Sequence, residues 1–243
     1  MRAVKVCHFT SDPREDHSKS PTGYSSEEFS VEPCPARKIS NCRAHDCKKV
    51  SMKFLLLGLL VFLAAHSVRI VADDWRSRVR ARYGELTWKG AYALVSLIGL
   101  VLVVWGFGMA RQQPVQLWNP PVAMRHVAAL LTLASFVLLA AAYVPGNGIK
   151  ARLHHPMVLA VKVWALAHLL ANGNLAHVIL FGSFLLWAIA DYASARRRDR
   201  AAGTRYPRGR AGSTGVTVFV GLAGWVVFAF WLHGMLIGIS PLG

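Results

Sequence analysis

Residues 155–173 read HPMVLAVKVWALAHLLANG, an apolar stretch that is interrupted by two histidines and a lysine. Similar apolar runs recur along the chain in blocks of about twenty residues, the length that crosses the hydrocarbon core of a bilayer as a helix. A soluble core would instead show shorter, more dispersed apolar patterns. The sequence therefore predicts an all-α, polytopic membrane protein.

The apolar runs predict a bundle of six transmembrane helices, near residues 53–72, 91–110, 125–143, 157–172, 175–193 and 216–238. Asparagine and glycine predict a tight turn at 172–174, and the same residue types end the third span at 143–148. The fourth span is short and joins the fifth directly through this turn.

The net charge of +16 comes from basic residues that lie between the apolar runs, as in RSRVRAR (76–82) and RRRDR (196–200). The loops after spans one, three and five carry fourteen Lys or Arg residues, and the opposite side carries three. Because positive loops stay in the cytoplasm, this bias places both termini on the periplasmic face of a bacterial inner membrane. We expect the lipid bilayer, and no nucleic acid, as the partner of this charge.

Residues 1–51 differ from the rest, because they are polar, rich in Ser and Pro, and contain all four cysteines. The cysteine spacing fits no closed zinc template. The apolar run that follows Met52 begins as bacterial inner-membrane proteins do. We expect a disordered extension over 1–51 and a membrane domain over 52–243, with Met52 as the true start; a genuine N-terminal tail is the alternative.

Ionisable groups inside the predicted spans are costly and mark function or pairing. Span one contains His66 and Arg69, span four contains Lys162 and His168, and His155 stands at the start of span four. His66 and His168 fall at similar depths, about 5 Å apart along the bilayer normal. Facing imidazoles could ligate a haem iron, bind another metal such as copper, or hydrogen-bond backbone carbonyls, and spacing alone leaves these readings open.

Several stretches resemble the NnrU family, including HSVRIVADDWR (66–76), AYVPGNGIKARLHHPMVLAVKVWALAHLLANG (142–173) and WLHG (231–234). The family is associated with denitrification, and it is related to the plant ζ-carotene isomerase, a membrane haem b enzyme with axial histidines. The resemblance implies that His66 and His168 are the axial ligands of haem b and that His155 has a supporting role. Arg69 and Lys162 are then expected to bind the haem propionates.

Three function classes remain, and whether the protein is an enzyme stays open. The first is a haem b protein of nitrite and nitric oxide metabolism, acting as a redox or NO-responsive component or as an isomerase-like enzyme. The second is a non-catalytic assembly or maturation factor for a nitrite or nitric oxide reductase. The third, a membrane methyltransferase, is disfavoured because the last sixty residues contain no glutamate.

Overall fold

The computed structural model describes residues 44–241, with side chains described from Ser51 onward. The described part of the chain is helical, and its elements are α1 (Ala44–Val71), α2 (Asp73–Tyr83), α3 (Glu85–Ala110), α4 (Ala123–Tyr143), α5 (Gly148–Leu153), α6 (Pro156–Ala171), α7 (Leu175–Ala201), α8 (Ala211–Val227), the π-helix η1 (Phe228–Leu232) and α9 (His233–Ile237). Most of the predicted extension 1–51 lies outside the described residues, and α1 begins within its last part.

Five helical segments are long and apolar enough to cross a membrane: α1 from Ser51, α3, α4, α7, and the continuous stretch Ala211–Ile237 that joins α8, η1 and α9. The shorter apolar helix α6 has 16 residues, or about 24 Å. These six segments match the six predicted spans in order, which confirms the all-α, polytopic membrane fold.

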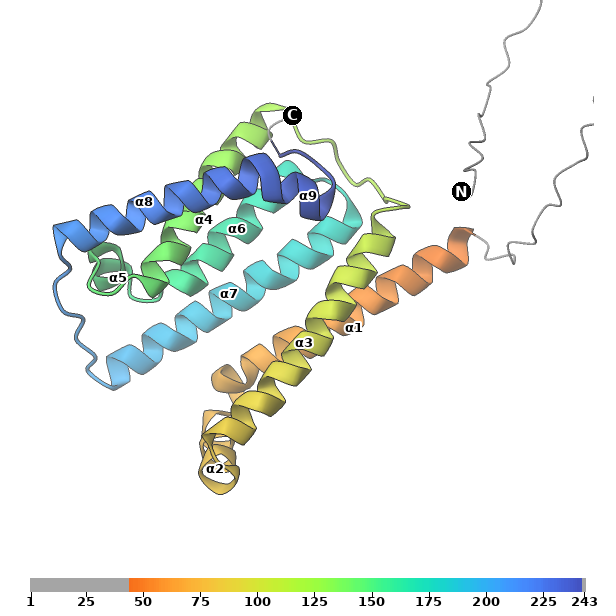
Figure 1. Ribbon diagram of the computed structural model, residues 1–243. Helices are drawn as coiled ribbons and strands as arrows, with labels where there is room; N and C mark the ends of the chain where they lie inside the picture. The colour runs from red at the N-terminus through yellow and green to blue at the C-terminus, as the bar shows by residue number, and fades with distance from the viewer. Residues whose placement is uncertain (1–43, 242–243) are drawn as a thin grey trace, which may run out of the picture. The chain divides into compact units, whose positions relative to one another are not determined.

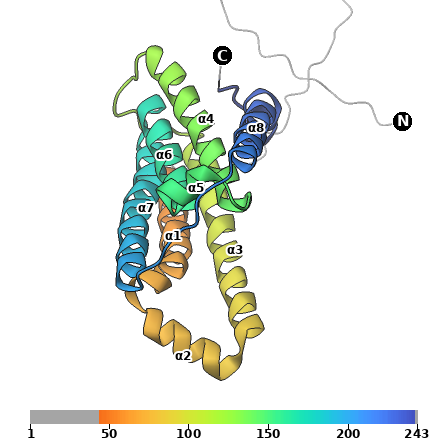
Figure 2. The same ribbon diagram turned by 90° about the vertical axis from the view of Figure 1, so that its left-hand side faces the viewer.

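The helices pack as neighbours in the order α3, α1, α7, α6, α4 and α8 (Figure 1). Helices α1 and α6 are not backbone neighbours in the described part of the chain, and α7 packs against both of them. The helix α2 connects α1 to α3 at one end (Figure 2). That end also holds the start of α6 and the end of α7, and we call it the arginine-rich end.

Close backbone contact holds α1 against α3. A Cβ atom added at Gly99 of α3 would lie 2.8 Å from the backbone nitrogen of Phe62, and one added at Gly106 would collide with the backbone at Leu55. Gly58 of α1 meets the backbone of Val103 in the same way. Small residues that let two backbones approach are typical of helix pairs in membranes, where apolar burial alone does not favour association.

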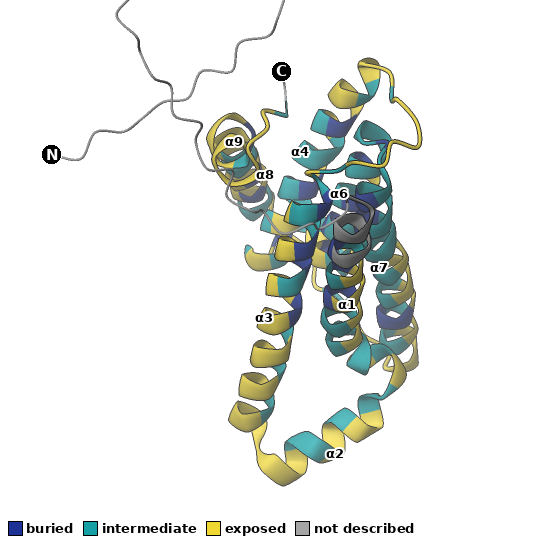
Figure 3. Ribbon diagram, turned by 90° about the vertical axis from the view of Figure 1, so that its right-hand side faces the viewer, coloured by how far each residue is buried: buried dark blue, intermediate teal, exposed yellow. Residues whose placement is uncertain are grey.

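Large apolar side chains are exposed along α3 and α8, where Figure 3 shows much of the ribbon in the exposed colour. Examples are Leu97 and Val101 on α3, and Phe219 and Leu222 on α8. A water-soluble protein rarely exposes such extended apolar surface. Lipid is the solvent in which these two faces are stable.

The predicted turns are both present and carry specific polar contacts. Asn147 is buried, donates to the carbonyl of Ala141 at 2.9 Å, and caps α5 by accepting from the Lys150 amide at 2.7 Å. In the second turn, at 172–174, the carbonyl of Gly173 accepts from the backbone amides of Leu117 and Trp118. This contact fixes the α3–α4 connection on the turn between α6 and α7.

Some sequence expectations about boundaries need correction. Residues 73–83, expected as a loop, form α2, and the chain breaks at Ala72 with φ −142° and ψ 44°. After this break, Asp73 forms an ion pair with Arg76 of α2 at 3.1 Å. Helix α7 extends eight residues beyond its predicted end, to Ala201.

Candidate functional site

His66 and His168 have the same local geometry. Each ring directs Nδ1 to the carbonyl four residues earlier in its own helix, at 2.7 Å to Phe62 for His66 and at 2.9 Å to Trp164 for His168. A carbonyl only accepts, so Nδ1 carries the hydrogen in both rings. In the neutral form of either ring, this tautomer leaves the lone pair on Nε2.

The ring of His66 lies among aromatic side chains of three helices. It stacks on Phe62 of α1 with 4.2 Å between ring centroids, and it lies 5.3 Å from Tyr92 of α3 and 5.9 Å from Trp187 of α7. This position is at the contact of α1, α3 and α7, on the side of the bundle away from α4 and α8.

His168 lies in a second aromatic group nearer the opposite end of the bundle. Its ring stacks on Phe181 of α7 at 4.4 Å and is tilted against Trp164 at 5.1 Å. His177 of α7 and His233 of α9 are close enough to interact electrostatically with it. His177 is fixed by Asn174, whose side chain accepts from its backbone amide at 3.1 Å and contacts its Nδ1.

The two histidines are separated by aromatic rings in series. Phe62 beside His66 lies 5.8 Å from Phe184 of α7, and Phe184 lies 5.7 Å from Trp164 beside His168. Along α7 the residues that contact the two histidines, Trp187 and Phe181, are six positions apart. This spacing corresponds to about 9 Å of height, more than the 5 Å expected from the sequence.

The donor chemistry of each histidine fits a haem ligand. Metal-bound histidines commonly donate their second ring nitrogen to a carbonyl, which fixes the ring and its tautomer, and both rings already do so. The ring contacts that link the two imidazoles run through Phe62, Phe184 and Trp164. Within the described residues, no three His, Cys, Asp or Glu side chains come together as a metal-binding group.

The basic residues expected near haem propionates lie towards the arginine-rich end. The ammonium group of Lys162 lies 5.6 Å from the ring centroid of Tyr192, over its face. The Arg69 side chain is exposed, and its backbone carbonyl accepts from the guanidinium of Arg198. Both are one to two helical turns from the histidine on their own helix, on its arginine-rich side.

His155 is not near the other two histidines, because thirteen residues, or about 20 Å of helix, separate it from His168. Its Nε2 donates to Oδ2 of Asp199 at 2.8 Å, and the same oxygen accepts from the Tyr206 hydroxyl at 3.0 Å. Arg196 approaches this oxygen at 3.5 Å. The resulting group, which we call the Asp199 cluster, joins the start of α6 to the end of α7 and to the loop before α8.

The residue next to His155 is held in an unusual conformation. His154 has φ 70°, and it is the one non-glycine residue with positive φ in the described part of the chain. Its ring lies 4.2 Å from the ring of Tyr206, and its buried Nδ1 has no hydrogen-bond partner among the described residues. Burial, followed by the hydrogen bond to Asp199, raises the pKa of the Tyr206 hydroxyl.

Sequence reasoning missed Asp199, Tyr206 and His177 as site residues. Asp199 carried a signal, because it is the only acidic residue from 192 to the C-terminus and lies within a run of arginines. A lone carboxylate in such a run is expected to bind several donors. His177 also carried a signal, because it is an ionisable residue inside the predicted span 175–193. Tyr206 carried none, since its position depends on how the loop before α8 folds back.

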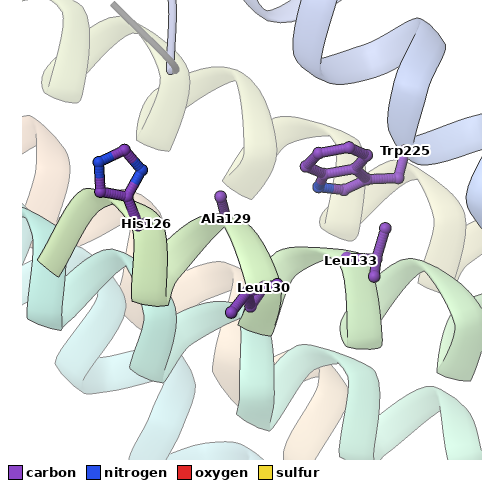
Figure 4. A pocket seen from close by; sticks show the side chains of 5 residues that line it. All are labelled: His126, Ala129, Leu130, Leu133 and Trp225. Carbon is purple, nitrogen blue, oxygen red and sulfur yellow. The ribbon is translucent and has the colours of Figure 1, made fainter. Parts of the chain in front are cut away.

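Two cavities in the described part of the chain have neither His66 nor His168 in their lining. One, of about 270 Å³, lies between α4 and α8 and is lined by His126, Ala129, Leu130, Leu133 and Trp225 (Figure 4). The other, of about 490 Å³, is at the arginine-rich end between α1 and α7.

A scan against protein-family models matches residues 54–241 to the family described as NnrU protein. The chain belongs to the NnrU family. The match covers all six membrane segments and both aromatic groups around the histidines. No curated protein and no solved structure matches the chain.

Proposed function

We propose that this NnrU-family protein is a haem b protein of the bacterial inner membrane that acts in nitrite and nitric oxide metabolism. The proposed topology has the arginine-rich end in the cytoplasm and both termini in the periplasm, because the loops at that end carry most of the positive charge. The association of the family with denitrification supports the metabolic setting.

The observation that carries the proposal is the hydrogen bond between Nδ1 of each of His66 and His168 and the carbonyl four residues earlier in its helix. Two imidazoles inside an apolar bundle, each with Nδ1–H bound to a carbonyl, leave Nε2 to coordinate haem iron. When bound, haem b supplies one-electron redox chemistry and an iron that binds nitric oxide.

The chain's own residues have separate roles in this proposal. The carbonyls of Phe62 and Trp164 orient the two imidazoles, and the rings of Phe181 and Trp187 limit their rotation. The aromatic side chains around them cover part of each imidazole. Arg69 and Lys162 supply positive charge for the propionates on the arginine-rich side.

Haem content tests the proposal. The full chain is produced with ample haem, purified in detergent, and its haem-to-protein ratio is measured after extraction into alkaline pyridine. We expect about one haem per chain, and strong loss of haem from His66→Ala and His168→Ala. His126→Ala, which changes an exposed histidine of α4, is the matched control and keeps its haem. Folded protein that never retains haem contradicts the proposal.

The series of aromatic contacts that links His66 to His168 favours a second candidate function. In that reading the histidines are structural, and the protein is a non-catalytic assembly or maturation factor for a nitrite or nitric oxide reductase. Deletion of the gene would then lower the cofactor content of the reductase, and the reductase would co-purify with this protein. Isomerase activity on a cis-polyene is tested separately, with the haem-loaded protein.

A further inference from the structure

The cavity at the arginine-rich end has one apolar side and one cationic side. Its apolar side is formed by Ile70 of α1 and by Ala190 and Ala193 of α7. Its cationic side is formed by Arg196, Arg197 and Arg200, which follow on the same helix. From Ala190 to Arg200 the helix rises about 15 Å, so the cavity runs from the apolar part of the span to its charged end.

Two of these three guanidinium groups are available to a ligand. Arg196 lies at 3.5 Å from Asp199, whose carboxylate already accepts from His155 and Tyr206. Arg197 and Arg200 are exposed. The neighbouring Arg198 is occupied differently, since it donates to Ser194 at 2.8 Å and to the Arg69 carbonyl of α1 at 3.4 Å.

The contact between Arg198 and Arg69 fixes α1 beside α7 at the mouth of the cavity. It brings a further exposed guanidinium, that of Arg69, to the same end of the two helices. None of the residues that line the cavity is acidic, and the carboxylate of Asp199 beside Arg196 is already shared among three donors. The cavity therefore keeps an excess of positive charge next to an apolar wall.

We propose that this cavity binds the phosphodiester headgroup of an anionic glycerophospholipid. Guanidinium groups bind phosphate oxygens through paired hydrogen bonds, and basic pockets between membrane helices on the cytoplasmic side suit anionic headgroups. The apolar wall of Ile70, Ala190 and Ala193 accommodates the adjoining acyl chain. A free phosphate or a polynucleotide would leave this wall without a partner, so the lipid is the occupant that satisfies both sides.

Lipid binding to the full chain tests the charged side. The protein in a neutral detergent is titrated with palmitoyl-oleoyl phosphatidylglycerol or with the phosphatidylcholine of the same chains, and bound lipid is counted by native mass spectrometry. We expect tighter binding of phosphatidylglycerol, and about fivefold weaker binding for each of Arg197→Gln and Arg200→Gln. The control Arg78→Gln/Arg152→Gln removes two exposed charges from the same end of the bundle and leaves binding within twofold of wild type.

A charge-neutral variant tests the apolar side. Ala193→Trp fills the cavity without changing charge and is expected to abolish the preference for phosphatidylglycerol, whereas Ala223→Trp on the exposed face of α8 is not. If the control Arg78→Gln/Arg152→Gln lost as much phosphatidylglycerol binding as Arg197→Gln or Arg200→Gln, the effect would be one of general surface charge and the proposal would be overturned. Competition by millimolar inorganic phosphate, or equal binding of phosphatidylcholine, would also overturn it. None of these readouts depends on haem.

Discussion

Nε2 of His155 lies 2.8 Å from Oδ2 of Asp199, and this contact joins residues that are 44 positions apart in the sequence. It fixes the start of the short helix α6 to the end of α7. Because the helix α6 has only 16 residues, its depth in the bundle depends on such contacts at its ends. His168, on the same helix, depends on that placement.

We therefore predict that Asp199→Asn lowers stability. The side chain of Asp199 is 14% exposed, and the substitution weakens its contacts with His155, Tyr206 and Arg196. Hydrogen bonds to charged groups contribute about 1.5–3 kcal/mol, so we expect a loss of about 2 kcal/mol. Thermal unfolding in detergent measures it, with Asp74→Asn, an exposed acid of α2, as the control. An unchanged midpoint would show that the Asp199 cluster does not stabilise the fold.

The Asp199 cluster also predicts an alkaline limit to stability. Because the pKa of Tyr206 is raised in the folded state, the hydroxyl stays protonated to higher pH there than in the unfolded chain. Its contribution is complete below the pKa of an unfolded tyrosine and is lost as the pH rises through the folded value. Tyr206→Phe should be less stable than wild type at pH 8, and its stability should fall less steeply with pH above pH ~10. Parallel pH profiles of the two proteins would contradict this role.

The contact between α1 and α3 predicts contrasting effects for two neighbouring glycines. A Cβ atom at Gly106 collides with the backbone of α1, whereas one at Gly108 has open space. Gly106→Ala should therefore separate the helices and reduce the yield of monodisperse protein in size-exclusion chromatography. Gly108→Ala should leave the yield unchanged or improve it, since alanine favours helix. Similar behaviour of the two variants would argue against the observed packing.

Arg69 offers a test of how the proposed haem is held. If its guanidinium binds a propionate, Arg69→Gln weakens haem retention during gel filtration without removing the iron ligands. The expected result is a lower haem-to-protein ratio than in Arg78→Gln, which changes an arginine on α2. Equal haem occupancy in the two variants would remove Arg69 from the site.

The number and order of the membrane helices could be predicted from the sequence, because apolar runs of sufficient length have few alternatives in a bilayer. Helix ends were less predictable. The fifth span was expected to end at residue 193, before the run of arginines, yet α7 continues to Ala201. A helix that leaves the bilayer can continue into water because its backbone hydrogen bonds lie within the helix. The π-helix over Phe228–Leu232 had no sequence signal.

The candidate site was predictable in part. The inward placement of His66 and His168 among aromatic residues follows from the cost of polar groups in lipid. Their relative height did not follow, because helices of different lengths and starting points shift along one another by several ångströms. The contact of His155 with Asp199 depends on the packing of α6 against α7 and on the continuation of α7 beyond residue 193, so it could not be deduced from local spacing.

The reduced-minus-oxidised absorption spectrum of the full chain, purified in detergent beside His66→Ala and His168→Ala, tests the central claim most directly. The proposed haem b site predicts a Soret band and sharp α and β bands on reduction, lost in both variants and kept in His126→Ala. Bands lost in only one variant would mean that a single one of these histidines ligates the iron. A featureless spectrum from well-folded protein would contradict the haem proposal and favour the assembly factor.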